Sequence, residues 1–365
     1  MPPTIRETMT TDLKTKALFD LANAYAYDYM DSINQRPVFP DEEAIGRLQR
    51  FDEPLPQEPQ PGKEILKLLH EVGSPATVAQ IGGRYFGFVN GSVIPASLAA
   101  RWLSDTWDQN AAMHVSSPTV AKLEEVCEGW LVGLLGLPHG TAAGYVTGTS
   151  IATLCGLAAG RDALLRRMGW NANDDGLFGA PPIRVVISEG AHGTVYKALS
   201  LLGLGRKRVE LVPADIHGRI DPTKLPHLDG STLLILQAGN VNSGAFDDFD
   251  TLCDQARSAG AWTHIDGAFG LWAAASPTYR PLTRGIEKAD SWSADGHKTL
   301  NTPYDCGIIL CKDRHALAAA MQAGGAYIQH SQNRDGMFYT PDMSRRARAV
   351  ELWPALRFLG REGVA

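Results

Sequence analysis

The chain has 365 residues, a net charge of −6 at pH 7 and 44% hydrophobic residues. This length and apolar content allow a sizeable core, in one large domain or two ordinary ones. The acidic balance offers no basic surface for nucleic acid or an anionic membrane. No apolar run approaches the roughly 20 residues that a membrane-spanning helix needs. The N-terminal stretch MPPTIRETMTTDLKTKALFD has no apolar core of a secretion signal, so we expect a cytoplasmic protein.

Five cysteines are spread widely along the chain, and no Cys-x-x-Cys pair occurs. An odd number at wide spacing argues against a disulfide framework and against a zinc site. We therefore expect free, mostly buried thiols and no bound metal.

The first part of the chain is predicted to be helical. Residues 10–36 have the pattern of an amphipathic helix, and residues 63–73 have helical spacing that stops at Gly73. Between them, the Pro-rich residues 51–62 are typical of an extended linker. This part has little core of its own. We expect residues 1–75 to form an N-terminal helical segment and residues 76–365 to form one large domain.

The large domain shows strands and helices in alternation. A long helix begins at Pro118, after Ser117, and the stretch GYVTGTS is a short strand or turn before a second helix. Strands are then predicted in IRVVISEG, RVELVPAD, STLLILQAG, WTHIDGAFG and CGIILCKD, with helices such as HGTVYKALSLLG and DFDTLCDQARSAG between them. Continuous apolar strands alternating with helices indicate an α/β fold, with a mostly parallel sheet covered on both faces. In such sheets, ligands bind at the carboxyl ends of the strands.

Two of these strand ends carry polar groups that suit an anion or a flat ligand. Thr147, Gly148, Thr149 and Ser150 stand immediately before a helix, where free backbone N–H groups favour negative charge. His192 follows the strand VVIS, where an imidazole ring can stack on a ligand and exchange protons. Taken singly, the first feature also fits a capped helix start, and the second fits a loop or core histidine.

Two further strand ends carry opposite charges. Asp266 ends an apolar strand and is followed by the small residues Gly267 and Ala268, which allow a planar group to approach. Lys298 lies 298 − 266 = 32 residues later, about the length of one βαβ unit. A lysine in an apolar pocket can form a Schiff base with a carbonyl. The alternatives are a helix-capping aspartate and a salt-bridged lysine near a turn.

Pyridoxal 5'-phosphate would use all four features together. It needs a lysine for covalent attachment, a carboxylate beside its ring nitrogen, an aromatic ring over one face and a phosphate site at a helix N-terminus. Each signal is weak alone, but their order on an alternating α/β chain favours this cofactor.

From about residue 80 onward, the sequence resembles the group II pyridoxal-phosphate-dependent amino acid decarboxylases, a family of fold type I that includes aromatic amino acid, glutamate and histidine decarboxylases. The stretch SWSADGHKTLNTPYDCG resembles the lysine motif, HIDGAFG the aspartate motif and EGAHGTVYKALSLLG the histidine motif. TGTSIATLCGLAAGRD resembles the phosphate loop, although Thr149, Ile151 and Thr153 depart from the usual residues there.

The resemblance implies a role for each matched residue. Lys298 would hold the cofactor, Asp266 its ring nitrogen, and Ala268 and His192 the two faces of its ring. The residues implied in the phosphate or cofactor contacts are Thr147, Gly148, Thr149, Ser150, Ser291, His297 and, in the loop QAGNVNSGAFDD, Asn242 with Ser243.

The resemblance also implies a reaction, decarboxylation of an L-amino acid to the amine and carbon dioxide. Tyr327 matches a loop tyrosine that returns a proton to the substrate carbon, and the alternative for it is a packing aromatic. Tyr85, Phe86 and Phe88 favour an aromatic substrate. Other pyridoxal-phosphate lyases or aldolases, aminotransferases, and an inactive relative that acts as a binding protein stay open.

The resemblance implies a homodimer as well, in which residues 1–75 wrap around the second chain. The chain stops at REGVA, and we expect the small C-terminal domain of the family to be absent.

Overall fold

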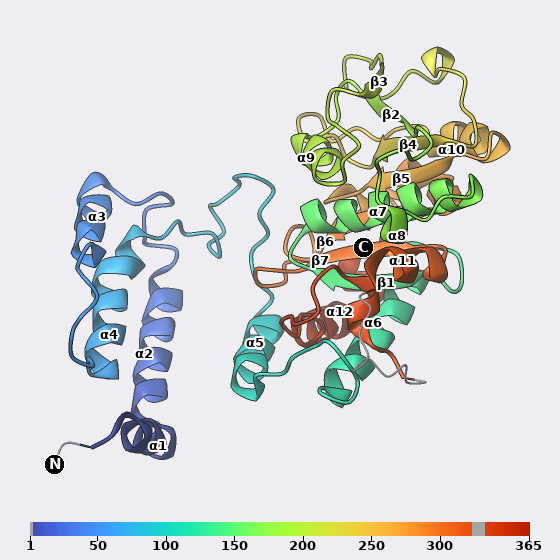
Figure 1. Ribbon diagram of the computed structural model, residues 1–365. Helices are drawn as coiled ribbons and strands as arrows, with labels where there is room; N and C mark the ends of the chain where they lie inside the picture. The colour runs from blue at the N-terminus through green and yellow to red at the C-terminus, as the bar shows by residue number, and fades with distance from the viewer. Residues whose placement is uncertain (1–2, 323–332) are drawn as a thin grey trace. The chain divides into compact units, whose positions relative to one another are not determined.

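The computed structural model describes residues 3–322 and 333–365. The chain forms two compact units, Met1–Ser92 (unit 1) and Val93–Ala365 (unit 2). Figure 1 shows their elements, and each unit is described by itself. Within the described residues, no helix is long and apolar enough to cross a membrane.

Unit 1 is helical, as predicted, and its helices are α1 (Ile5–Thr15), α2 (Ala17–Ser32), α3 (Glu42–Arg47) and α4 (Gly62–Leu68). The prediction of a single helix over residues 10–36 was wrong. Lys16 adopts a left-handed conformation, with φ of 60°, and donates its N–H to the carbonyl of Asp12, which ends α1 before α2 begins. Neither helix contains a buried residue. The buried hydrophobic residues of unit 1 among those described are Ala44, Val72 and Ala79.

The centre of unit 2 is a seven-stranded sheet with the order β1-β7-β6-β5-β4-β2-β3. The strands are β1 (Ala142–Val146), β2 (Arg184–Ser188), β3 (Val209–Val212), β4 (Thr232–Gln237), β5 (Trp262–Asp266), β6 (Ser291–Asp295) and β7 (Gly307–Cys311). Only β7 runs antiparallel to its neighbours, β1 and β6. The prediction of a mostly parallel sheet is confirmed.

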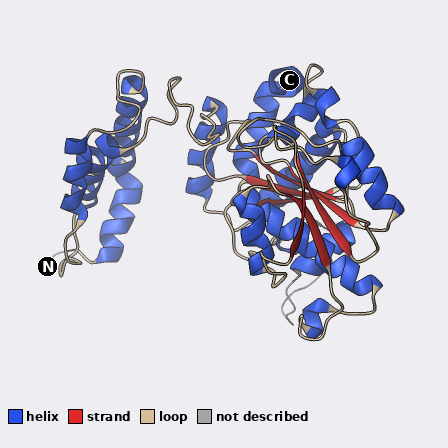
Figure 2. Cartoon of the chain, turned by 90° about the horizontal axis from the view of Figure 1, so that it is seen from above, coloured by secondary structure: helices blue, strands red, loops and turns tan. Residues whose placement is uncertain are grey.

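Helices cover both faces of this sheet, as Figure 2 shows. One apolar cluster lies under α7 (Thr149–Arg167), α9 (Gly193–Leu201) and α11 (Arg314–Met321). The other lies under α6 (Pro118–Leu135), α10 (Phe249–Ser258) and α12 (Ala349–Val364). Two more helices, α5 (Pro95–Trp107) and the short α8 (Ala172–Asp175), complete the unit. All five cysteines are buried, as predicted.

Strand β6 was not predicted, because its residues SWSAD lack the continuous apolar run of the other predicted strands. All five are buried. Trp292 and Ala294 join the apolar cluster under α6. On the α7 side, the Ser293 hydroxyl lies 2.9 Å from that of Thr153 in α7. Alternate residues thus supply a polar face toward α7, and hydrogen bonds make its burial tolerable.

Candidate active site

The site lies where β5 and β6 end beside the first turn of α7. Asp266 pairs in register with Ser293, so both strands present their carboxyl ends at one edge. Asp295 is the last residue of β6. Its N–H donates to the carbonyl of Ala268 (2.9 Å), and its carbonyl accepts from Trp272 Nε1 (3.0 Å). The backbone N–H and carbonyl of Asp295 are therefore both held by hydrogen bonds, which fixes the position of its Cα atom.

The Asp295 carboxylate joins three parts of the site. Its Oδ1 accepts a hydrogen bond from the backbone N–H of Thr149 (2.6 Å), at the start of α7. Its Oδ2 lies 3.2 Å from Lys298 Nζ and 3.5 Å from His297 Nε2. The carboxylate is only 3% exposed. The sequence analysis did not select Asp295; the signal for it is the alternation of polar residues at 291, 293 and 295.

The segment from Thr147 to Ser150 forms the predicted start of a helix. A Cβ atom at Gly307 would lie 2.3 Å from the Cα of Gly148, so this segment is packed directly against β7. Thr149 is buried, and its Oγ1 has no hydrogen-bond partner within the part of the chain that the structure describes. A buried hydroxyl without a partner costs free energy, and here it stands beside a helix N-terminus that attracts anions.

The ring of His297 is held on two sides. The N–H of Cys306 donates to its Nδ1 (3.0 Å), so the neutral ring carries its proton on Nε2, facing Asp295. Its ring also stacks on Tyr304, with centroids 4.2 Å apart. Burial lowers the pKa of His297, and the nearby Asp295 opposes this shift. Tyr304 is a further residue that the sequence analysis missed.

Asp266 and His192 border the same small pocket, together with Ala191 and Gln237. His192 starts α9, and its Nδ1 accepts from the N–H of Thr194 (3.3 Å). The buried Asp266 accepts from the N–H of Ala268 (3.2 Å). Burial raises the pKa of the Asp266 carboxyl, while the Ala268 N–H and the charges of Lys298 and His192 act against the rise. The structure therefore brings Asp266, Ala268, His192 and Lys298 to one place.

Ser291 is not brought to this place, which corrects the sequence analysis. It begins β6, four residues before Asp295, which is about 13 Å along a strand. Its Oγ accepts from Trp262 Nε1 (3.1 Å) and lies 2.8 Å from His264 Nδ1. These partners and its complete burial explain why the hydroxyl is there without any ligand.

Asn242 lies in the turn after β4 and is exposed. Its backbone N–H donates to the side-chain oxygen of the buried Asn240 (2.9 Å). The amide of Asn240 in turn donates to the carbonyl of Gly190 (3.4 Å), in the loop that carries His192. Asn240 was missed by the sequence analysis and connects this turn to the site. Tyr327 lies outside the described residues.

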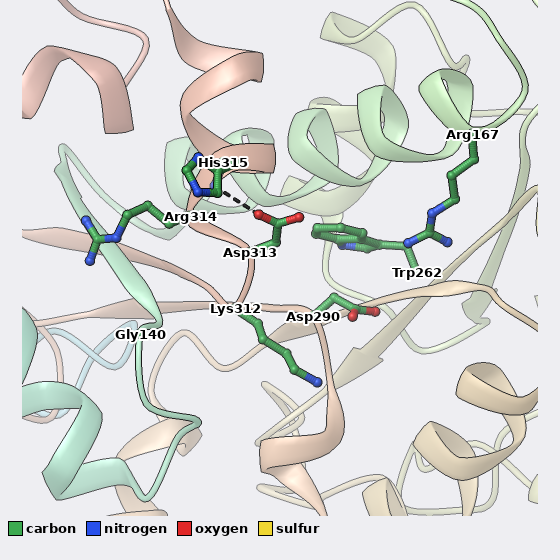
Figure 3. Close-up of a pocket in the computed structure, with 8 residues that line it drawn as sticks. All are labelled: Gly140, Arg167, Trp262, Asp290, Lys312, Asp313, Arg314 and His315. Carbon is green, nitrogen blue, oxygen red and sulfur yellow. Dashed lines mark hydrogen bonds between the residues drawn. The ribbon is translucent and has the colours of Figure 1, made fainter. Parts of the chain in front are cut away.

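A second pocket, with a volume of about 540 Å³, lies at the opposite edge of the sheet (Figure 3). Trp262 and Asp290 line it at the starts of β5 and β6, and Lys312 lines it just after β7. The charged side chains in Figure 3 point in different directions rather than toward one point. None of the site residues predicted from the sequence lines this pocket.

A lysine, a buried carboxylate, a histidine and a helix N-terminus at one sheet edge are the groups that pyridoxal-phosphate enzymes use. Residues 46–365 match the family described as pyridoxal-dependent decarboxylase conserved domain, and the chain belongs to this family. Its cofactor is therefore pyridoxal phosphate, and its class is that of the carboxy-lyases acting on amino acids.

Individual relatives are more distant. The chain is 28% identical to tryptophan decarboxylase 1 of Oryza sativa subsp. japonica, over 91% of this chain and 69% of that protein. It is 26% identical to the aromatic-L-amino-acid decarboxylase of Rattus norvegicus, over 93% of this chain and 75% of that protein. The crystal structure of Oryza sativa TDC with PLP and tryptamine has a TM-score of 0.86 and 23% identity, covering 100% of this chain and 76% of that one. This structural likeness confirms the predicted fold.

Proposed function

We propose that this chain decarboxylates an aromatic L-amino acid, with Lys298, Asp266 and the first turn of α7 forming its cofactor site. The observation that carries the proposal is the meeting of these three groups at the carboxyl ends of β5 and β6. When bound, the cofactor supplies an electron sink for the bond that breaks. The protein's residues must hold it, orient the substrate and manage the protons.

The start of α7 suits the phosphate group. The hydroxyl of Thr149 is buried and lacks a partner among the described residues, and Gly148 and Ser150 flank it at a helix N-terminus. His297 supports this assignment, because its proton on Nε2 faces the same place. Thr147 is exposed and borders the same segment. In this proposal, these residues fix the cofactor at its phosphate end.

Asp266 suits the ring nitrogen. A buried carboxylate is costly unless a cation lies beside it, and a protonated ring nitrogen is such a cation. Ala268 has a side chain small enough for a flat ring to pack against it. His192 borders the same pocket as Asp266, so its imidazole can cover the other face of the ring. Asn240 connects the turn that contains Asn242 to the loop that carries His192. In this proposal, Asn242 lies on the same side of the cofactor ring as His192.

Lys298 would hold the cofactor in this proposal through its side-chain amine. Its Nζ lies 3.2 Å from Asp295, which orients the amine toward the start of α7. Tyr327 returns a proton to the substrate carbon, with help from His192. That role of Tyr327 rests on its sequence motif alone.

The substrate class rests on the relatives. The proteins named tryptophan decarboxylase and aromatic-L-amino-acid decarboxylase support an aromatic amino acid. Tyr85, Phe86 and Phe88 belong to unit 1 and stay candidates for substrate contacts.

We also propose a homodimer in which residues 1–75 pack on the second chain. Ile5, Met9 and Leu13 share one side of α1 and are 64%, 60% and 64% exposed. A side this apolar needs a partner surface. Light scattering coupled to size-exclusion chromatography tests this directly: a monomeric mass for the cofactor-loaded protein would contradict it.

The test of function uses purified protein, pyridoxal phosphate and a panel of amino acids. We expect a visible absorption band for the wild type and none for Lys298→Ala. Carbon dioxide and the amine should appear with tryptophan or tyrosine, and not with glutamate. A keto acid product would instead indicate an aminotransferase. Failure of the wild type to bind the cofactor would indicate an inactive relative.

A further inference from the structure

We infer that Asp295 competes with the cofactor's phosphate for the N-terminus of α7 and so weakens the hold of the site on phosphate. The inference rests on the proposed function, in which the start of α7 is the phosphate site. It adds a residue that sets the affinity and phosphate selectivity of that site.

The contact that carries the inference is the hydrogen bond from the Thr149 N–H to Asp295 Oδ1, at 2.6 Å. This N–H is one of the few at the start of α7 that have no partner within the helix. A phosphate placed there would use the same donor. The side chain of Asp295 therefore already supplies the negative charge that a helix N-terminus attracts. The Thr149 hydroxyl beside it has no partner in residues 3–322 and 333–365.

Asp295 cannot withdraw easily. It pairs with Gly307 of β7, its N–H is bound by Ala268, and its carbonyl is bound by Trp272. Its side chain is almost completely buried. A phosphate at the start of α7 must therefore bind close to the Asp295 carboxylate, because the backbone of Asp295 is held in place.

The charges around Asp295 make this costly. Among the described residues, the basic groups within 4 Å of its carboxylate are Lys298 and His297. Burial lowers the pKa of His297, which favours the neutral ring. In the proposed function, the nitrogen of Lys298 that lies beside Asp295 would hold the cofactor. The phosphate of the cofactor would then stand close to a carboxylate of the same charge sign. Like charges at such separations oppose each other strongly inside a protein.

The informative variant is Asp295→Asn, because asparagine keeps an oxygen for the Thr149 N–H and removes the charge. A matched control is Asp290→Asn. Asp290 is also a poorly exposed carboxylate that accepts a backbone N–H, from Thr263 at 2.8 Å, but it lines the pocket at the opposite edge of the sheet. Its charge should not affect phosphate at α7.

The experiment measures dissociation constants of pyridoxal phosphate and of pyridoxal, which lacks the phosphate, for the full 365-residue chain. Using the ratio of the two constants cancels any change in the reactivity of Lys298. For Asp295→Asn we expect preference for the phosphorylated form to rise about tenfold or more over wild type. For Asp290→Asn we expect no change. An unchanged or smaller preference in Asp295→Asn overturns the inference.

A second measurement avoids the lysine altogether. Inorganic phosphate should raise the melting temperature of cofactor-free Asp295→Asn more than that of the wild type. If Asp295→Asn does not fold, Asp295→Ser takes its place, since serine keeps a short acceptor. An equal shift in wild type and variant contradicts the inference. If the wild type binds neither pyridoxal compound, the proposed function fails, and that result is distinct from a normal wild type with an unaffected variant.

Discussion

The two ends of strands β5 and β6 both carry charged residues, yet they use them differently. At the carboxyl ends, Thr149, His297 and Lys298 all converge on Asp295. The buried Thr149 hydroxyl has no partner in the part of the chain that the structure describes. At the amino ends, the pocket of Figure 3 has a volume of about 540 Å³, but its carboxylates accept hydrogen bonds from the protein's own backbone. Asp313 accepts from two N–H groups at the start of α11, and Asp290 accepts from Thr263. Pocket size therefore does not identify the site here; converging and unsatisfied groups do.

A buried chain of polar groups connects the two ends on the α7 side of the sheet. The Thr153 hydroxyl lies 2.9 Å from Ser293 Oγ, which lies 3.4 Å from His264 Nε2. His264 Nδ1 then meets Ser291, which accepts from Trp262. Burial lowers the pKa of His264 to about 3, so this ring is neutral at ordinary pH. These hydrogen bonds help to fix the position of α7 on the sheet. They therefore also help to fix the first turn of α7 at the candidate site.

The largest expected difference between the ends comes from their carboxylates. Asp266→Asn should lower the decarboxylation rate by about 10²–10³-fold, because a charged partner fixed in a buried site is lost. Asp290→Asn should change the rate less than about twofold, since its carboxylate accepts the Thr263 N–H at the opposite ends of the strands. The measurement is the rate of carbon dioxide release at saturating cofactor. Equal losses in both variants would remove the distinction between the two ends.

Two glycines give the next comparison. A Cβ at Gly307 would meet the backbone of Gly148 at 2.3 Å, whereas a Cβ at Gly140, in the opposite pocket, has open space. Gly307→Ala should therefore lower the free energy of unfolding by about 3 kcal/mol and weaken cofactor binding. Gly140→Ala, at a φ of 87°, should cost only about 1 kcal/mol of backbone strain. Denaturant unfolding measures both, and a larger loss for Gly140→Ala would contradict the packing account.

Removing the hydroxyl group of Ser291 or of Thr149 should have opposite effects on protein stability and cofactor binding. Ser291→Ala should lower the free energy of unfolding by about 1–2 kcal/mol, because Trp262 Nε1 and His264 lose a buried partner. It should leave the dissociation constant of pyridoxal phosphate unchanged. Thr149→Val should do the reverse, with weaker cofactor binding and little loss of stability, since its hydroxyl has no partner to lose. Thermal melts and cofactor titrations on both variants test this, and weaker cofactor binding by Ser291→Ala would restore the original assignment.

The smallest effect is a pH dependence from His264. Its pKa is about 3 in the folded chain against 6.5 for an ordinary histidine, so the unfolded chain binds the extra proton first. The stability contributed by the neutral ring is thus complete above pH 6.5 and is lost as pH falls toward 3. The slope is at most about 1.4 kcal/mol per pH unit. In the difference between wild type and His264→Gln, this slope should be visible between pH 6.5 and the lower limit of folding. A difference that is flat with pH would mean that His264 binds a proton as readily in the folded chain as in the unfolded chain.

The sequence was sufficient to predict the alternating α/β fold and the edge that carries Lys298, Asp266 and His192. Asp266 ends β5 and His192 follows β2, and both strands have clear apolar runs. Strand β6 and the position of Ser291 could not be predicted, because serine and aspartate form a buried strand only when another element, here α7, supplies hydrogen-bond partners. Asp295 and Asn240 were missed for a related reason. Their importance lies in hydrogen bonds to Thr149 and Gly190, which are distant in sequence.

The proposed cofactor site lies at the carboxyl ends of β5 and β6. Its location can be measured by loading the chain with pyridoxal phosphate, reducing the lysine-bound cofactor with borohydride and finding the modified residue by peptide mass spectrometry. We expect modification of Lys298. Modification of Lys312, in the pocket at the opposite edge, with Lys298 left free, would contradict it.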